Sequence, residues 1–444
     1  MAREAIFEAG GDAARDFHER FVRMRRPVVL TDVPSELAPI LAWSNSELKR
    51  LAGEAVLEVE TRGQEEEEQQ QKQVETPRGL HGVAAQRFGK GRKLEGVRFA
   101  HVIERLASGD DSMYQTTQSL KLDPESRRPM VTSAPVTQLV MAGQVPVRPK
   151  LLGNLVPMNL NVWMGNTKEG TCSGLHHDFH DNLYVLARGR KRFELYSPAD
   201  APFMYTVGAL AKVHANGRIN YEGFPTNADG SEVGSLEALL ASESKEAAET
   251  ELAAAEAAVA RGDKGARKRL ERAEEALDAA LGNVLDAGDF DDFDEEEGEA
   301  DRDDYEEDEE EGEGEGEGES DIDENDEEQA PPKAKRAKID AADPTQTPLN
   351  FSRVRLDMPI DKVAFPLFGK AKRMTVEIAA GEMLFLPAGW FHCVTSYNGA
   401  ARDAEFSGHL AFNYWMHPPD TMDFDKPYSS PFWQRDWDAR KTHL

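Results

Sequence analysis

The hydrophobic and polar positions of residues 1–150 alternate between helical and strand spacing. Phe17 and Phe21 are separated by about one helical turn, and residues 26–33 (RPVVLTDV) form a short apolar run with polar ends. These patterns predict a helix and a strand, respectively. The segment Ser44 to Glu47 (SNSE) is a capping box, which predicts that a helix begins there. We therefore expect an N-terminal part of mixed α and β structure that packs on the core.

From about Leu160 the pattern changes to short apolar or alternating runs separated by Gly and Pro. The runs are LNVWMG, NLYVLARG and KRFELYSP, followed later by MTVEIAAGEMLFLPAG, FHCVTS and HLAFNYWM. Several short strands with turn signals between them predict a sandwich or barrel, and a jelly roll is a common form of it. We therefore expect a mainly β protein with α-helices and a jelly-roll core.

A long segment of another kind interrupts the β pattern. Residues 235–285 are rich in Ala, Glu, Leu and Arg and predict two helices broken at RGDKG, which would form a hairpin or coiled coil. Between Asp289 and Glu328 the chain has 27 acidic residues and one Arg, a net charge of −26. Such a segment cannot offset its ordering entropy by burying apolar surface, so we expect it to be disordered.

The resulting domain organisation places an insertion between two halves of one β domain. We expect an N-terminal α/β part (1–150), a first half of the β core (151–234), the insertion (235–345), a second half of the core (346–420) and a C-terminal tail (421–444). In the tail, Phe432, Trp433 and Trp437 would either pack on the core, which we favour, or support a homodimer.

Charge and cysteine content indicate which partners and which cellular compartment to expect. The whole chain has a formal charge of −30, so about −4 remains outside the acidic tract. A near-neutral core offers no phosphate-binding surface, and we expect no nucleic-acid partner. Two cysteines and no apolar run of about 18 residues predict a soluble protein of a reducing compartment, without a membrane partner. Residues 332–338 (PKAKRAK) are typical of a nuclear localisation signal, so we expect the nucleus, the cytoplasm or both.

Residues 176–182 (HHDFHDN) contain a dense set of metal-binding side chains. On a helix, His176 and His180 would share a face, as in the H-E-x-x-H zinc peptidases, but His177 occupies the position of the glutamate base. On a strand, residues i and i+2 share a face, so His176 and Asp178 would point together. The flanking sequence is β on both sides, which favours the strand.

A third metal ligand must then come from elsewhere, and His392 in LPAGWFHCV is the candidate. Two histidines and one carboxylate are typical of the facial triad of non-heme Fe(II) oxygenases, whereas a structural zinc site takes four protein ligands. In the strand KRFELY, Lys191 lies on the apolar face with Phe193 and Leu195. A buried ammonium is unfavourable without an anion beside it, so Lys191 predicts an anionic co-substrate.

These residues resemble the Jumonji-C (JmjC) family of Fe(II)- and 2-oxoglutarate-dependent oxygenases. The resemblance rests on H176-x-D178, Lys191 fifteen residues after the first histidine, GEMLFLPAGWFH ending in His392, and AFNYW. It implies a cupin-like double-stranded β-helix, Fe(II) bound by His176, Asp178 and His392, and 2-oxoglutarate and O2 as co-substrates. It implies that Lys191 binds the distal carboxylate of 2-oxoglutarate. The other residues that it places in the co-substrate pocket are Asn182, Asn413, Ser173, Tyr114 and Tyr184.

The family pattern gives His177, His180 and Asp181 no ligand role, and we expect them to be rim or structural residues. Cys393, next to the third ligand, is expected to be a small buried hydrophobic residue. Within the family, NLYV after H-x-D and FNYWM resemble the small hydroxylase subgroup, above all the Jumonji lysyl hydroxylase that acts on GTP-binding proteins. The insertion has no counterpart in that enzyme.

The resemblance implies a protein hydroxylase, with a lysyl side chain as one candidate target. Two alternatives stay open: a JmjC lysine demethylase, and a non-catalytic cupin-like scaffold that binds basic proteins through the acidic tract. The chain lacks the zinc-finger patterns of reader modules, which favours the hydroxylase over the demethylase. The expected partner is a protein substrate such as a basic histone, a ribosomal protein or a GTP-binding protein.

Overall fold

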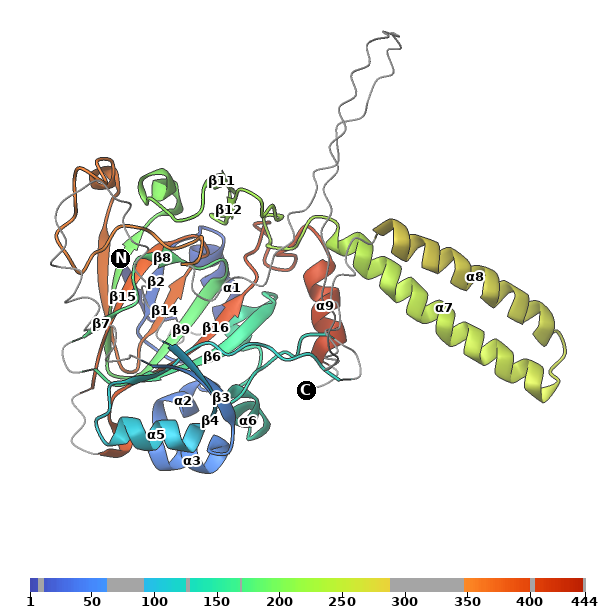
Figure 1. Ribbon diagram of the computed structural model, residues 1–444, viewed down its shortest axis with the longest axis horizontal. Coiled ribbons are helices and arrows are strands. Elements are labelled where there is room, and N and C mark those ends of the chain that lie inside the picture. Colours follow the sequence, from blue (N-terminus) through green and yellow to red (C-terminus); the bar gives the residue numbers. More distant parts are fainter. Residues whose placement is uncertain are drawn as a thin grey trace, which may run out of the picture. The chain divides into compact units, whose positions relative to one another are not determined.

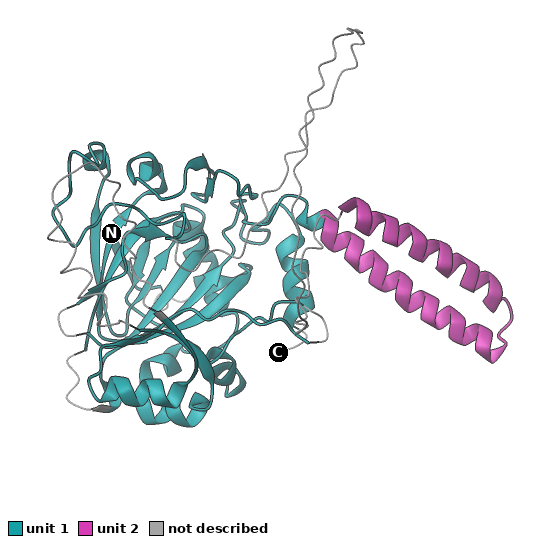
Figure 2. Cartoon of the chain, viewed as in Figure 1, with its two compact units in different colours: residues 1–236, 340–444 teal, residues 237–339 magenta. Residues whose placement is uncertain are grey.

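The computed structural model divides the chain into two compact units (Figure 1, Figure 2). One unit comprises residues 1–236 and 340–444, and the other comprises residues 237–339. The residues that the structure describes are 1–6, 12–61, 92–124, 128–167, 170–287, 347–399 and 404–441. The acidic tract and the basic motif at 332–338 lie outside these ranges.

The N-terminal part contains both helices and strands. Its helix α3 begins at Asn45, and the Ser44 hydroxyl accepts a hydrogen bond from Glu47 N at 3.1 Å, which confirms the predicted cap. The elements of this part are β1 (Ala2–Glu4), α1 (Ala13–Phe17), the π-helical turn η1 (His18–Val22), β2 (Val28–Leu30), α2 (Ala38–Ala42), α3 (Asn45–Ala52), β3 (Val56–Thr61), β4 (Arg92–Arg98), α5 (Phe99–Ala107), β5 (Met113–Gln115), α6 (Val136–Met141) and the 3-10 helix η2 (Lys150–Leu152).

The core of the first unit consists of two β-sheets. The larger sheet has nine strands in the order β1-β2-β14-β9-β16-β6-β5-β3-β4, and the smaller has the order β13-β10-β15-β7, with β8 also paired to β15. The core strands are β6 (Pro157–Gly165), β7 (Thr171–Cys172), β8 (His176–His177), β9 (Asp181–Arg188), β10 (Arg190–Tyr196), β13 (Met374–Ala379), β14 (Met383–Leu386), β15 (Phe391–Tyr397) and β16 (His409–Met416).

Most consecutive core strands lie in different sheets, as in a double-stranded β-helix, and the exceptions are β7 with β8 and β10 with β13, which lie in the smaller sheet. The turn between β9 and β10 leads from the larger to the smaller sheet, and the turn between β13 and β14 leads back. Strands from either side of the insertion pair directly, since β14 is antiparallel to β9 and β15 is antiparallel to β10. The expected fold class, mainly β with α and a cupin-like jelly-roll core, is confirmed.

Side-chain alternation along each strand produces two hydrophobic layers. On β9, Tyr184 and Leu186 point into the space between the sheets, where they pack with Phe193 and Leu195 of β10. The intervening Leu183 and Val185 point to the outer face of the larger sheet and join the core formed with the N-terminal helices, of which α2, α3, α5 and α6 gather at the bottom of Figure 1. The space between the sheets is therefore the interior of the β-helix.

The remaining elements of this unit cover the core. They are η3 (Pro198–Phe203), β11 (Leu210–Val213), β12 (Ile219–Tyr221), η4 (Phe368–Lys370), η5 (Ala404–Phe406) and α9 (Phe432–Arg440). In α9, Trp437 is 5% exposed and packs with Val131, Val156 and Tyr428, as expected for core packing of the tail. Among the described residues, no helix is both long enough and apolar enough to cross a membrane.

The second unit is described as two helices, α7 (Ser235–Arg261) and α8 (Ala266–Ala287). They lie side by side and antiparallel (Figure 1), and Glu251 of α7 forms an ion pair with Arg269 of α8 at 2.6 Å. Their buried hydrophobic residues are all alanines. Six of them repeat every seven positions, Ala241, Ala248 and Ala255 in α7 and Ala266, Ala273 and Ala280 in α8, and the seventh is Ala258. Alanine at these positions permits close approach of the two helix backbones.

Candidate metal centre

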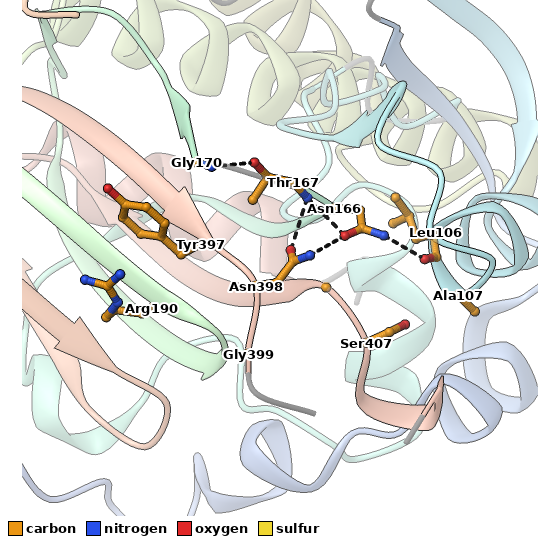
Figure 3. A pocket seen from close by; sticks show the side chains of 12 residues that line it. Leu106, Ala107, Asn166, Thr167, Gly170, Arg190, Tyr397, Asn398, Gly399 and Ser407 are labelled. Carbon is orange, nitrogen blue, oxygen red and sulfur yellow. Dashed lines mark hydrogen bonds between the residues drawn. The ribbon is translucent and has the colours of Figure 1, made fainter. Parts of the chain in front are cut away.

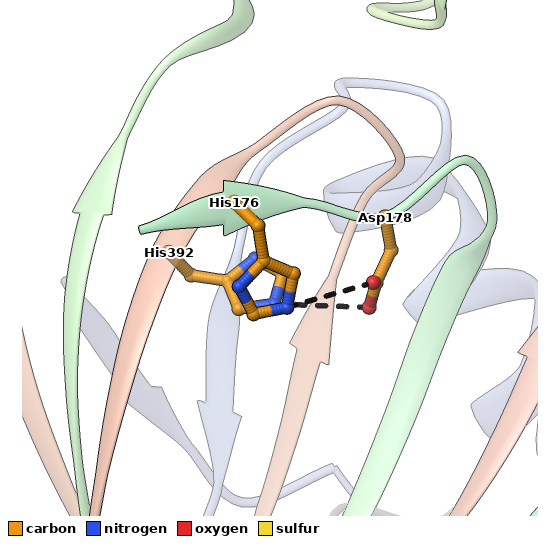
Figure 4. Close-up of side chains that lie close together, drawn as sticks. All are labelled: His176, Asp178 and His392. Carbon is orange, nitrogen blue, oxygen red and sulfur yellow. Dashed lines mark ion pairs between the residues drawn. The ribbon is translucent and has the colours of Figure 1, made fainter. Parts of the chain in front are cut away.

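Three side chains from two strands converge at one end of the interior of the β-helix (Figure 4). His176 lies on β8 and is directly opposite His392 on β15, so that both imidazoles project from the same face. Asp178 follows β8 immediately, and its carboxylate oxygens lie 3.9 Å from His176 Nε2 and 3.7 Å from His392 Nε2. Potential ligand atoms of the three residues all lie within 4.8 Å of one another, close enough to share one metal ion.

The hydrogen bonds behind the two imidazoles determine which nitrogen of each ring faces Asp178. His176 Nδ1 lies 3.1 Å from the carbonyl oxygen of Gly174, and His392 Nδ1 lies 2.9 Å from that of Trp390. Because a carbonyl oxygen only accepts, Nδ1 carries the proton in both rings. Each Nε2 therefore presents its lone pair at the convergence point, as metal-binding histidines require.

The electrostatic surroundings keep His176 neutral. Burial, with a smaller contribution from the neighbouring His392, lowers the pKa of His176 from 6.5 to about 4. At neutral pH the imidazole is therefore unprotonated on Nε2 and available as a ligand. Two imidazole nitrogens and one carboxylate oxygen suit a divalent transition metal with open coordination positions, and they are too few for a closed structural zinc site.

Lys191 of β10 lies on the same interior face, further along the smaller sheet. Its side chain is 1% exposed, and Nζ donates to the hydroxyl of Ser396, directly opposite on β15, at 2.6 Å. No carboxylate among the described residues forms an ion pair with it, and burial lowers the pKa of Lys191 from 10.5 to about 7. Ser396 is four residues from His392 along β15, roughly 13 Å. An elongated ligand with an anionic far end would match both the metal site and this ammonium.

The other residues of the predicted co-substrate pocket lie around the same space. Asn182 and Asn413 are neighbours on the larger sheet, and Asn413 Nδ2 donates to Asn182 Oδ1 at 2.9 Å. Tyr184 follows on the interior face of β9, and burial raises its pKa well above 10. The ring of Tyr114 on β5 lies 6.3 Å from that of Trp163. The Ser173 hydroxyl donates to the Gly174 carbonyl and accepts from Val394 N, at 3.0 Å each.

The surplus histidines of the HHDFHDN segment lie away from the three converging side chains. His177 is fully buried on the outer side of the smaller sheet, and its Nε2 is 2.7 Å from the Tyr221 hydroxyl. The ring of His180 lies 5.7 Å from that of His417. Neither histidine belongs to the group that could bind a metal.

Asp181 has a structural role, which is one of the two roles expected for it, and the structure identifies its partners. Its carboxylate is fully buried, accepts from Arg25 Nη1 at 2.7 Å and also accepts from Ala388 N at 2.9 Å. Ala388 lies in the turn that leads into β15, and the next residue, Gly389, donates to the carbonyl of Asp178 at 2.9 Å. Asp181 thus anchors the segment that positions His392.

An Asp181→Ala substitution is expected to destabilise the protein by about 3–5 kcal/mol, because it leaves the Arg25 guanidinium largely buried without its partner. Asp16→Ala is the matched control, since Asp16 pairs with Arg20 on the surface at 3.0 Å. That exposed pair should contribute less than about 1 kcal/mol. Urea unfolding of both full-length variants measures the two values, and equal losses would contradict an anchoring role for Asp181.

The expectation for the two cysteines is wrong. Cys393 is buried, at 2% exposure, but it is bonded to Cys172, and the two residues are 221 positions apart in the chain. Cys172 ends β7, which pairs with β15 next to Cys393. The bond therefore joins the strand that precedes His176 to the strand that contains His392. Sequence spacing did not reveal it, because the pairing depends on the register of β7 against β15.

A Cys172→Ser/Cys393→Ser double variant is expected to lose about 2–4 kcal/mol of unfolding free energy, since the bond restricts a long loop of the unfolded chain. A thiol-free phosphine reductant should lower the stability of the wild-type protein by a similar amount and leave the double variant unchanged. Denaturant unfolding with and without the reductant measures this. A wild-type protein that is insensitive to full reduction would contradict the prediction.

Three further residues contact the site without having been predicted. The ring of Phe351, just after the insertion, stacks on that of His176 at 4.7 Å and 9°. Trp163 and Asn161 of β6 both donate to Asn413 Oδ1. Phe351 lies in no segment with helical or strand periodicity, so the sequence pattern did not indicate its position. The contacts of Trp163 and Asn161 could be predicted only with knowledge that β6 lies next to β16.

The cavity drawn in Figure 3 lies away from the three converging side chains. It has a volume of about 650 Å³, and its polar walls include Asn166, Thr167 and Asn398. The amides of Asn166 and Asn398 are hydrogen-bonded to each other, and Thr167 N donates to Asn398 Oδ1 at 3.1 Å. None of its lining residues belongs to the predicted site, so we do not assign it to the chemistry at His176.

Comparisons with known proteins give findings that accord with this geometry. A family model described as "Cupin-like domain" matches residues 14–422. The chain is 29% identical over 459 residues to "JmjC domain-containing protein 4" of Schizosaccharomyces pombe, an alignment that covers 97% of this chain and 87% of that protein. A 45-residue stretch, 10% of this chain and 12% of the other, is 47% identical to "JmjC domain-containing protein E" of Dictyostelium discoideum.

Proposed function

We propose that this chain, which belongs to the Cupin-like domain family, is an Fe(II)- and 2-oxoglutarate-dependent oxygenase. In this proposal it hydroxylates a side chain of a protein substrate. The family, together with a JmjC relative aligned over nearly the whole chain, suggests the oxygenase class. The observation that carries the proposal is the convergence of His176 Nε2, His392 Nε2 and the Asp178 carboxylate in the same interior that contains the buried Lys191, which no described carboxylate pairs with.

Each residue has a distinct part in this proposal. Fe(II) and 2-oxoglutarate, when bound, supply the oxidising chemistry that uses O2 to hydroxylate a C–H bond while 2-oxoglutarate is converted to succinate and CO2. His176, Asp178 and His392 would hold the metal through the three converging atoms. Lys191 and Ser396 would bind the distal carboxylate of 2-oxoglutarate and fix its orientation. The apolar interior around Phe193 and Leu195 excludes water from the ion pair and strengthens it.

The test is turnover of 2-oxoglutarate by the full-length protein. With Fe(II), ascorbate, O2 and 2-oxoglutarate, we expect succinate to form, at a low uncoupled rate without a substrate and faster with one. Succinate is quantified by NMR, with a metal-chelated sample as the control. Complete absence of succinate with every substrate fraction tried would refute the oxygenase and favour the non-catalytic scaffold.

The reaction type and the substrate belong to the proposal as well. We propose a protein substrate, with a lysyl side chain as the first candidate by resemblance to the small hydroxylase subgroup. Basic proteins of the nucleus or cytoplasm, such as histones, ribosomal proteins or GTP-binding proteins, are the first class to test, through attraction to the acidic tract. Mass spectrometry separates the reactions, because a hydroxylated peptide gains one oxygen and a demethylated peptide loses one methylene.

A further inference from the structure

A relay of side-chain amides crosses three adjacent strands of the larger sheet. Asn161 of β6 lies directly opposite Asn413 of β16 on the interior face, and Asn182 of β9 lies diagonally across from Asn413, next to its β9 partner Tyr184. Asn413 is fully buried, and its Oδ1 accepts from Asn161 Nδ2 at 3.1 Å and from Trp163 Nε1 at 2.9 Å. Its Nδ2 donates to Asn182 Oδ1 at 2.9 Å.

The orientation of each amide in this relay follows from which of its neighbours can only donate a hydrogen bond. An amide group can usually be placed in either of two orientations, which differ by exchange of oxygen and nitrogen. The indole of Trp163 has only a donor, so the Asn413 atom beside it must be oxygen. The other end of the Asn413 amide is then nitrogen, and the Asn182 atom that it contacts must be oxygen. Trp163 therefore determines the orientation of two amides in series.

The last group of the relay faces the proposed co-substrate. Asn182 is two residues before Tyr184 on β9 and shares its interior face. With Oδ1 bonded to Asn413, the free end of the Asn182 amide is Nδ2, and no described residue accepts a hydrogen bond from it. A donor at this position is suited to an oxyanion, whereas a reversed amide would present an oxygen and repel it.

An unsatisfied atom in the relay argues against a purely structural role. Asn161 Oδ1 is buried and has no hydrogen-bond partner among the described residues. Buried polar atoms are nearly always hydrogen-bonded, because an unpaired one costs free energy of folding. The unpaired oxygen of Asn161 therefore indicates that its amide has a role besides stabilising the fold. Its other end supplies the second donor to Asn413 Oδ1, which holds that oxygen in place from two directions.

We propose that Trp163 and Asn161 are positioning residues that act through Asn413 to direct Asn182 Nδ2 toward the anionic co-substrate. This inference rests on the proposed function, since it assigns the relay to the binding of 2-oxoglutarate. Trp163 and Asn161 touch neither the metal ligands nor Lys191 through any hydrogen bond. Their effect is to keep one of two amide orientations.

The test is a Trp163→Phe variant of the full-length protein, which deletes the indole N–H and keeps an aromatic ring against Tyr114. The KM for 2-oxoglutarate is expected to rise roughly tenfold, with kcat changed less than about twofold. Trp415→Phe is the matched control: the ring of Trp415 lies 6.0 Å from that of Trp163, but its indole nitrogen is buried and has no hydrogen-bond partner among the described residues. Equal KM values in the two variants would overturn the proposal.

A double-variant cycle separates action through Asn413 from a direct effect. In an Asn413→Ala background the relay is already broken, so Trp163→Phe should raise KM no further. A full additional increase in that background would overturn the proposal, because Trp163 would then act without Asn413. Thermal unfolding midpoints of all variants show whether a KM change merely follows a loss of stability.

A measurement without turnover distinguishes failure of the relay from failure of the proposed function. In metal-free protein labelled with ¹⁵N, the side-chain amide of Asn182 should give one pair of NMR signals, and Trp163→Phe should add a second pair from the reversed orientation. A single unchanged pair in the variant would overturn the relay. If wild-type protein formed no succinate while the amide signals behaved as expected, the proposed function would fail and the relay would stand.

Discussion

In a His176→Ala variant, turnover of 2-oxoglutarate is expected to fall below detection. The substitution removes one of the three atoms that converge on the metal position and leaves only His392 and Asp178. Loss of a residue that merely hydrogen-bonds a metal ligand costs roughly 10–100-fold in metal affinity, and loss of a ligand itself should cost at least the upper end of that range. Calorimetric titration with Mn(II) measures the affinity, and succinate formation measures the turnover.

The control for this experiment is His101→Ala. His101 is an exposed residue of α5, so its removal deletes an imidazole without touching the interior of the β-helix. Its Mn(II) affinity and succinate formation should equal those of the wild-type protein. Normal turnover in His176→Ala, with a correctly folded protein by circular dichroism, would exclude His176 as a ligand.

Lys191→Ala is expected to raise the KM for 2-oxoglutarate by roughly 100-fold or more, because one partner of a buried ion pair is lost and the distal carboxylate remains unpaired. Lys212→Ala serves as a control, since Lys212 is an exposed lysine on β11. Mn(II) affinity should be unchanged in both variants, since Lys191 contacts Ser396 and no metal ligand. An unchanged KM would remove Lys191 from the co-substrate site.

The same lysine should make co-substrate binding depend on pH. Burial lowers the pKa of Lys191 to about 7, so part of the population is neutral at pH 7 without ligand. A bound carboxylate favours the charged form and raises that pKa, so binding takes up protons and affinity falls as pH rises above about 7. Calorimetry in two buffers of different ionisation enthalpy measures the uptake, which should disappear in Lys191→Ala.

Strand periodicity predicted the part of the site that is local in sequence. Alternation in KRFELY predicted that Lys191 faces the interior, and its 1% exposure confirms this. The same argument paired His176 with Asp178, and the structure brings them together with His392. These predictions succeeded because the direction of a side chain on a strand depends only on its position along that strand.

Features that depend on the register between distant strands were not predictable in this way. The Cys172–Cys393 bond requires β7 to pair with β15, and the amide relay requires β6, β16 and β9 to be neighbours. Phe351 reaches His176 only because the chain returns beside β8 after the insertion. In each case the contact is fixed by which strands are neighbours in the sheet, and the pattern of residues along one strand does not show this.

The position of the insertion has a consequence for how the protein is made. His392 follows His176 by 216 residues, and at the usual speed of a ribosome the third ligand is synthesised roughly 10 to 40 s after the first. During this interval the nascent chain contains His176 and Asp178 but lacks the third proposed ligand. The proposed three-ligand site is therefore complete only after His392 has been synthesised.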